Sequence, residues 1–275
     1  MSDDLKTLYG GVTNRRVSPR DLIEAKDRGE KWAMLTSYDM LTAGLFDEVG
    51  IPVLLVGDSA GNNVLGYDTT VPVTMEDMIP LVRGVVRGTK RPMIVADMPF
   101  GSYQESPEQA FRNAARFLQL GAQAVKLEGG QRVLPQVKLL AESGIPVMGH
   151  LGLTPQSVNA IGYRVQGRGE DGHQLIDDAL AMQEAGAFAI VLEVVPADLA
   201  ERVTKELDIP TIGIGAGPNT DAQVLVWTDM AGLTPKGLKL AKAYADLRTV
   251  LGDAARAYAD EVRGGQFPGP EHSFS

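Results

Sequence analysis

Short apolar runs alternate with longer amphipathic stretches along most of this 275-residue chain. This alternation is typical of buried parallel strands whose connections are helices. Predicted helices end at Gly121, Gly144 and Gly186, and an apolar run follows each of these glycines within a few residues. Gly50 likewise stands between a predicted helix and an apolar run. A unit that recurs this regularly places the chain in the α/β class.

The number of apolar runs is eight, which favours a closed (β/α)8 TIM barrel. An open, doubly wound sheet is the competing architecture, but it would usually carry a nucleotide-binding loop after its first strand, and none is there. The last of the eight runs could also form a helix. The predicted strands cover residues 33–36, 53–58, 93–97, 124–128, 146–150, 189–193, 210–214 and 223–227, and the predicted helices cover residues 40–49, 74–87, a stretch from 106, 134–141 and 172–185.

The length of the chain suits one large domain better than several small ones, so we expect residues 1–275 to form a single barrel domain. Ser18 followed by Pro19 is a typical helix start, and it predicts an extra helix over about residues 18–28 before the barrel. Helices over about residues 235–263, where Ala and Leu are frequent, are expected after the barrel.

The composition argues against several classes of function. A net charge of −9 makes nucleic acid an unsuitable partner, because binding phosphates needs a basic surface. The absence of cysteine excludes disulfides and thiolate metal sites. The first residues lack a signal-peptide pattern and no apolar run approaches the length of a membrane span, so we expect a cytoplasmic protein with no membrane partner.

Four of the predicted strands end in a carboxylate: Asp58, Asp97, Glu128 and Glu193. The carboxyl ends of barrel strands all open onto one face, which is where barrel enzymes carry out their chemistry. A charge close to a dry core must be paired or coordinated. Four acids at one rim therefore suggest a bound cation together with a general base.

Asp58, Asp97 and Glu128 end neighbouring strands, and their hard oxygen atoms suit Mg²⁺. The alternative is that each acid only caps a strand end and holds loop N–H groups. Zinc is disfavoured because cysteine is absent and histidine is scarce. Glu193 lies well around the barrel from these three acids, so it would keep its basicity and serve as the general base; its alternative role is a salt bridge.

Lys126 precedes Glu128 by two residues, so both side chains point the same way from one strand. A lysine aimed into a barrel could bind a substrate carboxylate or form a Schiff base, and the nearby acid favours the charged form and hence the first role. His150 ends the fifth strand, where it could be structural or could contact substrate. Ser59, next to Asp58, offers a hydroxyl donor for a carboxylate.

Several longer motifs resemble those of one known family. The chain is similar to the ketopantoate hydroxymethyltransferases, formally 3-methyl-2-oxobutanoate hydroxymethyltransferases, over nearly its whole length. No single motif suffices, but together they are highly specific. The matching stretches are residues 56–59, 66–70, 96–100, 125–130, 149–156, 192–193, 213–217 and 267–274.

The resemblance implies a (β/α)8 barrel, a homo-oligomer that is commonly a decamer, and Mg²⁺ as cofactor. It also implies 5,10-methylenetetrahydrofolate as the one-carbon donor and 3-methyl-2-oxobutanoate as the acceptor, in the pathway to pantothenate and coenzyme A. By the same resemblance Asp58 and Asp97 would be direct metal ligands in contact with the chelated keto acid, and Glu128 would complete the metal site. Ser59 and Lys126 would hold the carboxylate and oxo oxygens of the keto acid.

The resemblance also implies that His150 lies beside the substrate and that Glu193 accepts the proton. The chain departs from the family pattern at residues 157–163, where the loop is one glycine shorter, and at Ala222 and Thr228, where Gly and His are usual. None of these departures removes a carboxylate.

Two other functions compete with this one. A Mg²⁺-dependent lyase or mutase of the phosphoenolpyruvate and isocitrate lyase type is also a barrel that acts on 2-oxo acids, but such enzymes commonly use a cysteine base, which this chain lacks. A barrel that has lost activity and only binds a ligand is the non-enzymatic alternative. It gives no reason for a base set apart from the other acids.

Overall fold

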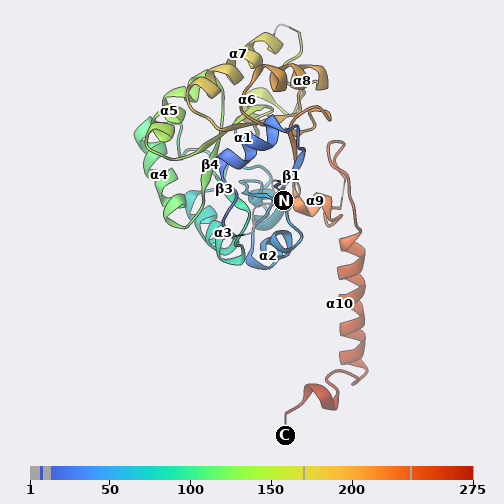
Figure 1. Cartoon of the computed structure of the whole chain (residues 1–275). Helices are drawn as coiled ribbons and strands as arrows, with labels where there is room; N and C mark the ends of the chain where they lie inside the picture. The colour runs from blue at the N-terminus through green and yellow to red at the C-terminus, as the bar shows by residue number, and fades with distance from the viewer. Residues whose placement is uncertain (1–6, 9–13, 170, 236, 275) are drawn as a thin grey trace. The chain divides into compact units, whose positions relative to one another are not determined.

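Eight parallel strands pair in chain order and close into a barrel in the computed structural model of this chain, so the predicted (β/α)8 architecture is confirmed. Figure 1 shows the helices arranged around the outside of the strands. The strands are β1 (Trp32–Thr36), β2 (Val53–Val56), β3 (Met93–Asp97), β4 (Ala124–Glu128), β5 (Val147–Gly152), β6 (Ala189–Glu193), β7 (Thr211–Ile214) and β8 (Ala222–Leu225). The longer helices of the barrel unit are α1 (Pro19–Asp27), α2 (Met40–Glu48), α3 (Met75–Gly88), α4 (Pro107–Gln119), α5 (Leu134–Glu142), α7 (Asp171–Glu184) and α8 (Ala197–Glu206).

The structure describes residues 7–8, 14–169, 171–235 and 237–274. It divides into two compact units, Met1–Val226 and Trp227–Ser275, which are described separately. The first unit holds the barrel, and the second holds the short helix α9 (Trp227–Met230) and the long helix α10 (Leu247–Arg263). The expectation that the whole chain is one domain stays a prediction. None of the described helices is long and apolar enough to cross a membrane.

Two expectations about secondary structure need correction. The predicted helices over 235–263 are helical only from Leu247, because residues 237–246 form a largely irregular segment that contacts α9. The N–H of Tyr244 donates to the carbonyl of Met230 at 2.8 Å, and these backbone hydrogen bonds override the local preference for a helix. Residue 236 lies outside the described residues. The eighth strand ends at Leu225 rather than at residue 227, and helix α8 was not predicted at all.

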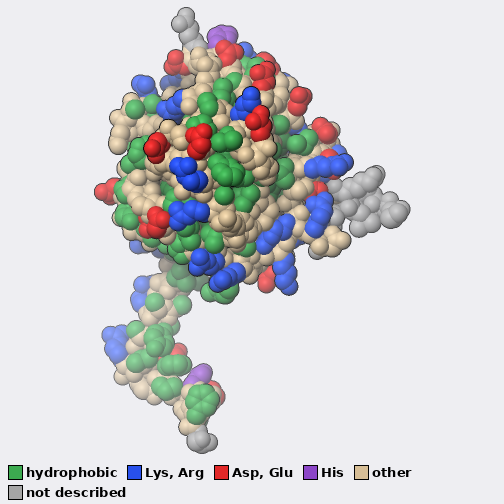
Figure 2. Space-filling view, turned by 90° about the vertical axis from the view of Figure 1, so that its left-hand side faces the viewer, with side chains coloured by type: hydrophobic (Ala, Val, Ile, Leu, Met, Phe, Trp, Pro, Cys, Tyr) green, Lys and Arg blue, Asp and Glu red, His purple; other side chains and the backbone are tan. Residues whose placement is uncertain are grey.

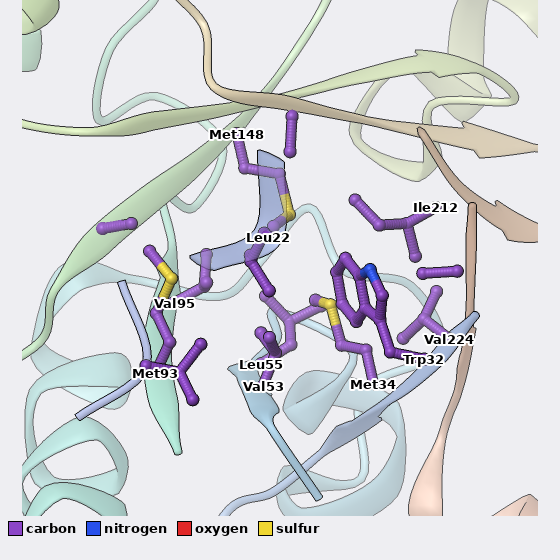
Figure 3. Packing of buried hydrophobic residues seen from close by; sticks show 14 of the residues in the cluster. Leu22, Trp32, Met34, Val53, Leu55, Met93, Val95, Met148, Ile212 and Val224 are labelled. Atoms are coloured by element: carbon purple, nitrogen blue, oxygen red, sulfur yellow. The ribbon is translucent and has the colours of Figure 1, made fainter. Parts of the chain in front are cut away.

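Inward-facing side chains at the amino ends of the strands make an apolar core. Alternate residues of each strand face the barrel axis, so β3 contributes Met93 and Val95 and β2 contributes Val53 and Leu55. Figure 3 shows these side chains packed together with Leu22, which comes from helix α1. The barrel is therefore filled by side chains at the amino ends of its strands.

Helix α1 covers the amino ends of the strands. Leu22 and Ala25 are fully buried in the barrel core. Lys26 forms an ion pair of 2.9 Å with Asp221, directly before β8, and also donates to the carbonyl of Thr204 at the end of α8. These contacts fix α1 across the barrel, and the predicted helix over about 18–28 is confirmed as Pro19–Asp27.

Asp21 holds the start of α1 in place. Its carboxylate accepts hydrogen bonds from the N–H and hydroxyl of Ser18 at 2.8 and 2.6 Å, and Arg15 donates to both of its oxygens at 2.6 and 2.7 Å. The hydrogen bond from Arg15, aided by those from Ser18, lowers the pKa of Asp21 to about 2. An acid in the first turn also interacts favourably with the helix dipole.

We expect Asp21→Asn to lower the free energy of unfolding by about 1 kcal/mol at neutral pH, because it removes a charged helix cap. The folded-state pKa of Asp21 is depressed to about 2, so the stabilisation is complete above the ordinary carboxyl pKa of about 4 and is lost as the pH falls through 2. Urea unfolding of both proteins at about pH 7 and about pH 3 measures this difference and its decline.

The matched control is Asp27→Asn, which removes the same charge from the exposed last residue of α1. It is expected to leave the free energy of unfolding unchanged or slightly raised, since an acid at a helix C-terminus opposes the dipole. Equal destabilisation by both variants would show that the cap at Asp21 has no special part in stability.

Candidate active site

The carboxyl ends of β3 to β6 carry charged side chains on the same inward face as the apolar core below. Asp97 follows Met93 and Val95 in alternation, and Lys126 and Glu128 follow Ala124 in the same way. Asp97, Lys126 and Glu128 are 1–3% exposed. The predicted convergence of strand-end acids at one face is therefore present in the structure.

Lys126 lies at the centre of this cluster. Its Nζ is 2.9 Å from Asp97 Oδ1 and 3.2 Å from His150 Nδ1. Burial acts to lower the pKa of Lys126, but the carboxylates of Asp97, Glu128 and Asp58 together outweigh burial and raise it. Lys126 is thus a permanent cation, which fits the binding of an anion better than a Schiff base.

His150 joins the buried acids to Glu193. Its Nδ1 is 3.3 Å from Glu128 Oε1, and its Nε2 is 3.1 Å from Glu193 Oε2. Burial and the Lys126 cation act to lower the pKa of His150, but the contacts with Glu128 and Glu193 outweigh them and raise it to about 9. In this arrangement the imidazole is protonated at neutral pH, and Nδ1 faces the carboxylate as a donor rather than accepting from Lys126.

Asp58 completes the set of buried acids from the turn after β2. Its backbone N–H donates to Asp97 Oδ2 at 3.2 Å, and its Oδ2 accepts from Gln156 Nε2 at 2.9 Å. Burial, together with the charges of Asp97 and Glu128, raises the pKa of Asp58 well above its ordinary value. Burial likewise raises the pKa of Asp97. The cluster therefore has too few cationic groups of its own to stabilise all of its carboxylates.

Gln156 and Tyr103 are two members of the site that the sequence reasoning missed. The amide of Gln156 also donates to the carbonyl of Met98 at 2.9 Å, and its backbone N–H donates to Glu128 Oε2 at 3.0 Å. The hydroxyl of Tyr103 donates to Gln156 Oε1 at 2.8 Å. Gln156 thus ties the loops after β2, β3 and β5 to the end of β4. Its position as the last residue of the motif 149–156 was the one available indication.

Ser59 lies beside this cluster rather than inside it. Its hydroxyl is 2.9 Å from the hydroxyl of Tyr38, and its side chain is only partly buried. The structure gives no contact between Ser59 and Lys126, the two residues expected to hold the keto acid together. The binding role of Ser59 stays a prediction.

Glu193 is held on a constrained backbone at the end of β6. The next residue, Val194, has φ of 50°, a left-handed conformation that is costly for a β-branched side chain. Gly152 of β5 is the register partner of Glu193, and a Cβ at Gly152 would lie 2.3 Å from the carbonyl oxygen of Glu193. The side chain of Glu193 is 17% exposed, more than the other acids, so it reaches the open side of the site.

The fit of a divalent cation can be judged from the buried acids. Asp97 Oδ1 and Glu128 Oε1 are buried without accepting a hydrogen bond, although a cationic nitrogen lies near each. Four carboxyl groups face the two cations Lys126 and His150, so the acids outnumber the cations of the cluster. As the described side chains lie, no three histidine or acidic groups form a ready-made cage for a metal ion. The donor chemistry and the charge fit one divalent ion at Asp58, Asp97 and Glu128, while its ligand geometry stays a prediction.

Comparison with known proteins identifies the family. Residues 16–270 match the family model described as ketopantoate hydroxymethyltransferase. The chain belongs to this family. A 3-methyl-2-oxobutanoate hydroxymethyltransferase of Streptomyces coelicolor is 64% identical over 99% of this chain and 94% of the relative. A relative of the same name from Thermobifida fusca is 60% identical over 98% of this chain and 97% of the relative.

Solved structures with the same fold are distant in sequence. A phosphonopyruvate hydrolase solved with oxalate and Mg²⁺ superposes with a TM-score of 0.61 at 12% identity, covering 93% of each chain. A 2,3-dimethylmalate lyase of the phosphoenolpyruvate mutase and isocitrate lyase superfamily gives 0.60 at 15% identity, covering 93% of each chain. These likenesses support the barrel fold.

We expect Gln156→Leu to lower kcat/KM for the family's reaction by about tenfold or more, because the variant frees Asp58 and the β3 loop from their shared amide. The lost hydrogen bonds should also lower the free energy of unfolding by about 1–3 kcal/mol. Steady-state kinetics and urea unfolding on the same preparations measure both effects.

Gln183→Leu is the matched control for Gln156→Leu. The side chain of Gln183 accepts hydrogen bonds from the N–H groups of Asp208 and Ile209 at 2.7 and 3.1 Å, far along the chain from the acids. This control should lose stability but keep its kcat/KM. A Gln156 variant that also kept its kcat/KM would restrict Gln156 to a structural role.

Proposed function

We propose that this enzyme transfers a hydroxymethyl group from 5,10-methylenetetrahydrofolate to 3-methyl-2-oxobutanoate, giving 2-dehydropantoate in the pathway to pantothenate and coenzyme A. Family membership supports the reaction class. The structural observation that carries the proposal is the contrast between Glu193, which reaches the open side of the barrel, and the buried acids beside it. Such a contrast suits a reaction that needs a proton acceptor next to a site that stabilises negative charge.

In this proposal Glu193 removes the proton from C3 of the keto acid. Water releases the methylene unit of the donor as formaldehyde and leaves tetrahydrofolate, the enolate carbon bonds to the carbonyl carbon of the formaldehyde, and the resulting alkoxide takes up the proton held by Glu193. Lys126 offsets the negative charge of the bound keto acid and its enolate. His150, 3.1 Å from Glu193 through Nε2, holds the carboxylate of the base in position.

Asp58, Asp97 and Glu128 would hold Mg²⁺ in the working enzyme. Their oxygens are the ligands that this ion prefers, and its charge would stabilise the ionised forms of all three acids. The bound ion would act as a Lewis acid on the keto oxygen. Gln156 and the backbone N–H of Asp58 orient the carboxylates for this purpose.

The lyase or mutase alternative has the same fold but less support. The solved structures that share the barrel are under 25% identical, so they say nothing about the reaction of this chain. A C–C or P–C bond-breaking enzyme of that kind commonly uses a cysteine base, and this chain has no cysteine.

The decisive experiment follows the C3 proton of 3-methyl-2-oxobutanoate in D2O by NMR, and then the formation of 2-dehydropantoate when 5,10-methylenetetrahydrofolate is added. We expect Mg²⁺-dependent exchange and donor-dependent product. Glu193→Gln should lower both rates by about a hundredfold or more while the keto acid still binds, because the variant keeps the shape of the side chain but cannot accept a proton.

Glu201→Gln, on the exposed side of α8 where it pairs with Lys205, is the matched control and should keep the wild-type rates. Exchange without donor-dependent product would contradict hydroxymethyl transfer and favour the lyase. Failure of exchange and product together would favour a binding protein. Undiminished rates in Glu193→Gln would assign the base to another group.

A homo-oligomer, expected to be a decamer by family resemblance, is supported by uncovered apolar side chains. Helix α10 spans 17 residues, and none of them is buried in the single chain. Figure 2 shows apolar side chains open on the surface of the C-terminal unit. Leu41 and Leu45 on α2 are 78% and 54% exposed, so a second apolar face lies on the barrel unit. We propose that other copies of this chain cover these faces. The cytoplasmic location stays a prediction.

Sedimentation velocity should give a mass several times that of the chain. Replacing Val250 and Leu251 on α10 with Glu should reduce the assembled mass, because two charges would enter an apolar interface. Lys239→Glu, in the loop before α10, serves as a control outside the helix. A monomer in the wild-type protein would contradict the proposal.

A further inference from the structure

Two cavities of the barrel unit meet at Gly167. The larger has a volume of about 510 Å³ and the smaller about 220 Å³, and Gly167 lines both of them. The φ angle of Gly167 is 75°, and a Cβ at this position would come within 2.5 Å of Leu199. Glycine therefore lets the chain pass between the cavities without a side chain to divide them.

The larger cavity lies beside the active site, at the carboxyl ends of β4 and β5. Gly129, in its lining, donates its N–H to the carbonyl of His150 at 3.1 Å. Gln166, also in its lining, donates its N–H to the carbonyl of Val194 at 3.0 Å, and Val194 is the residue after Glu193. A molecule in this cavity would thus lie against the backbone that positions both the imidazole and the base.

The larger cavity presents a carboxylate suited to a flat donor of two N–H groups. Asp178, half-buried on α7, accepts from Gln174 Nε2 at 2.9 Å through Oδ1. Its Oδ2 lies so close to Gly130 that an added Cβ there would overlap it. The carboxylate is therefore fixed at the rim after β4. A 2-amino-4-oxopterin has adjacent ring N–H and amino groups that pair with such a carboxylate in a bidentate way.

The smaller cavity is basic, in contrast to the acidic chain as a whole. Arg168, Arg202 and His173 line it, and Asp198 is the acid that lines it among the described residues. Within the described part of the chain, no hydrogen bond or ion pair engages either guanidinium. The first turn of α8 also lines this cavity, and no side chain caps it. Carboxylate groups are the ligands that free arginines and an uncapped helix start favour together.

We propose that the two cavities form one groove for the folate donor, with Asp178 holding the pterin edge and with Arg168 and Arg202 holding the carboxylates of the glutamate tail. This inference rests on the proposed function, since it assigns the second substrate of the same reaction. Gly129, which follows Glu128, and Gly152, the register partner of Glu193, both line the larger cavity, so the pterin end lies at the rim of the barrel beside the active site. The tail points away, toward the smaller cavity.

The test compares two donors, 5,10-methylenetetrahydrofolate and 5,10-methylenetetrahydropteroate, which lacks the glutamate. The double variant Arg168→Gln/Arg202→Gln should raise the KM for the folate donor by about fivefold or more, because two charge-assisted contacts are lost. It should leave the KM for the pteroate donor within about twofold, since that donor has no tail carboxylates. Asp178→Asn should raise the KM for both donors by about fivefold or more.

The double variant Arg83→Gln/Arg112→Gln is the matched control, because it removes the same charge from exposed positions on α3 and α4. The C3 exchange of the keto acid, which uses no donor, reports on the same samples whether the catalytic groups remain in place. An unchanged KM for the folate donor in the Arg168/Arg202 variant, or an equal rise for both donors, would overturn the groove. If the wild-type protein transferred no hydroxymethyl group, the proposed function would be wrong. The affinity of the same variants for tetrahydrofolate, measured by fluorescence titration, would then test the groove independently of the reaction.

Discussion

The ion pair between Lys126 and Asp97 is the interaction on which the active site depends. Three acids are buried at the ends of β2, β3 and β4, where desolvation is costly for each carboxylate. Lys126, 2.9 Å from Asp97, is the cation that rises into this cluster from the strand interior. The barrel can hold so much charge at one end because the side chains that fill the other end are apolar and stabilise the fold.

Other polar groups of the site orient the acids through hydrogen bonds and ion pairs. Gln156 binds Asp58 with its amide and Glu128 with its backbone N–H, so one residue fixes acids from two strands. His150 extends the cluster toward Glu193, the most exposed of the acids. The strained backbone at Val194 lies directly after that acid. Strain of this kind persists only where surrounding contacts enforce it, and here it coincides with the proposed base.

Much of this arrangement could be predicted from the sequence, because it follows from the geometry of strands. The alternation of side chains placed Lys126 and Glu128 on one face, and the barrel topology brought Asp97 and Glu193 to the same end. Gln156 could not be derived in this way, since it comes from a loop whose path depends on tertiary contacts.

The other predictions that failed did so for the same reason, because tertiary contacts set the path of the chain there. Residues 237–246 are rich enough in Ala, Leu and Lys to resemble a helix, yet most of them are irregular and Tyr244 donates its N–H to Met230 of α9 instead. The two cavities that meet at Gly167 were equally hidden, because helix α7 and the loop before it make walls that no periodicity in the sequence reveals.

The position of α1 limits the direction from which reactants can reach the acids. Because Leu22 and the core residues around it fill the amino end of the barrel, that end offers reactants no path to the acids. Both substrates of the proposed reaction would therefore have to approach the acids from the carboxyl end, where the loops that follow the strands lie.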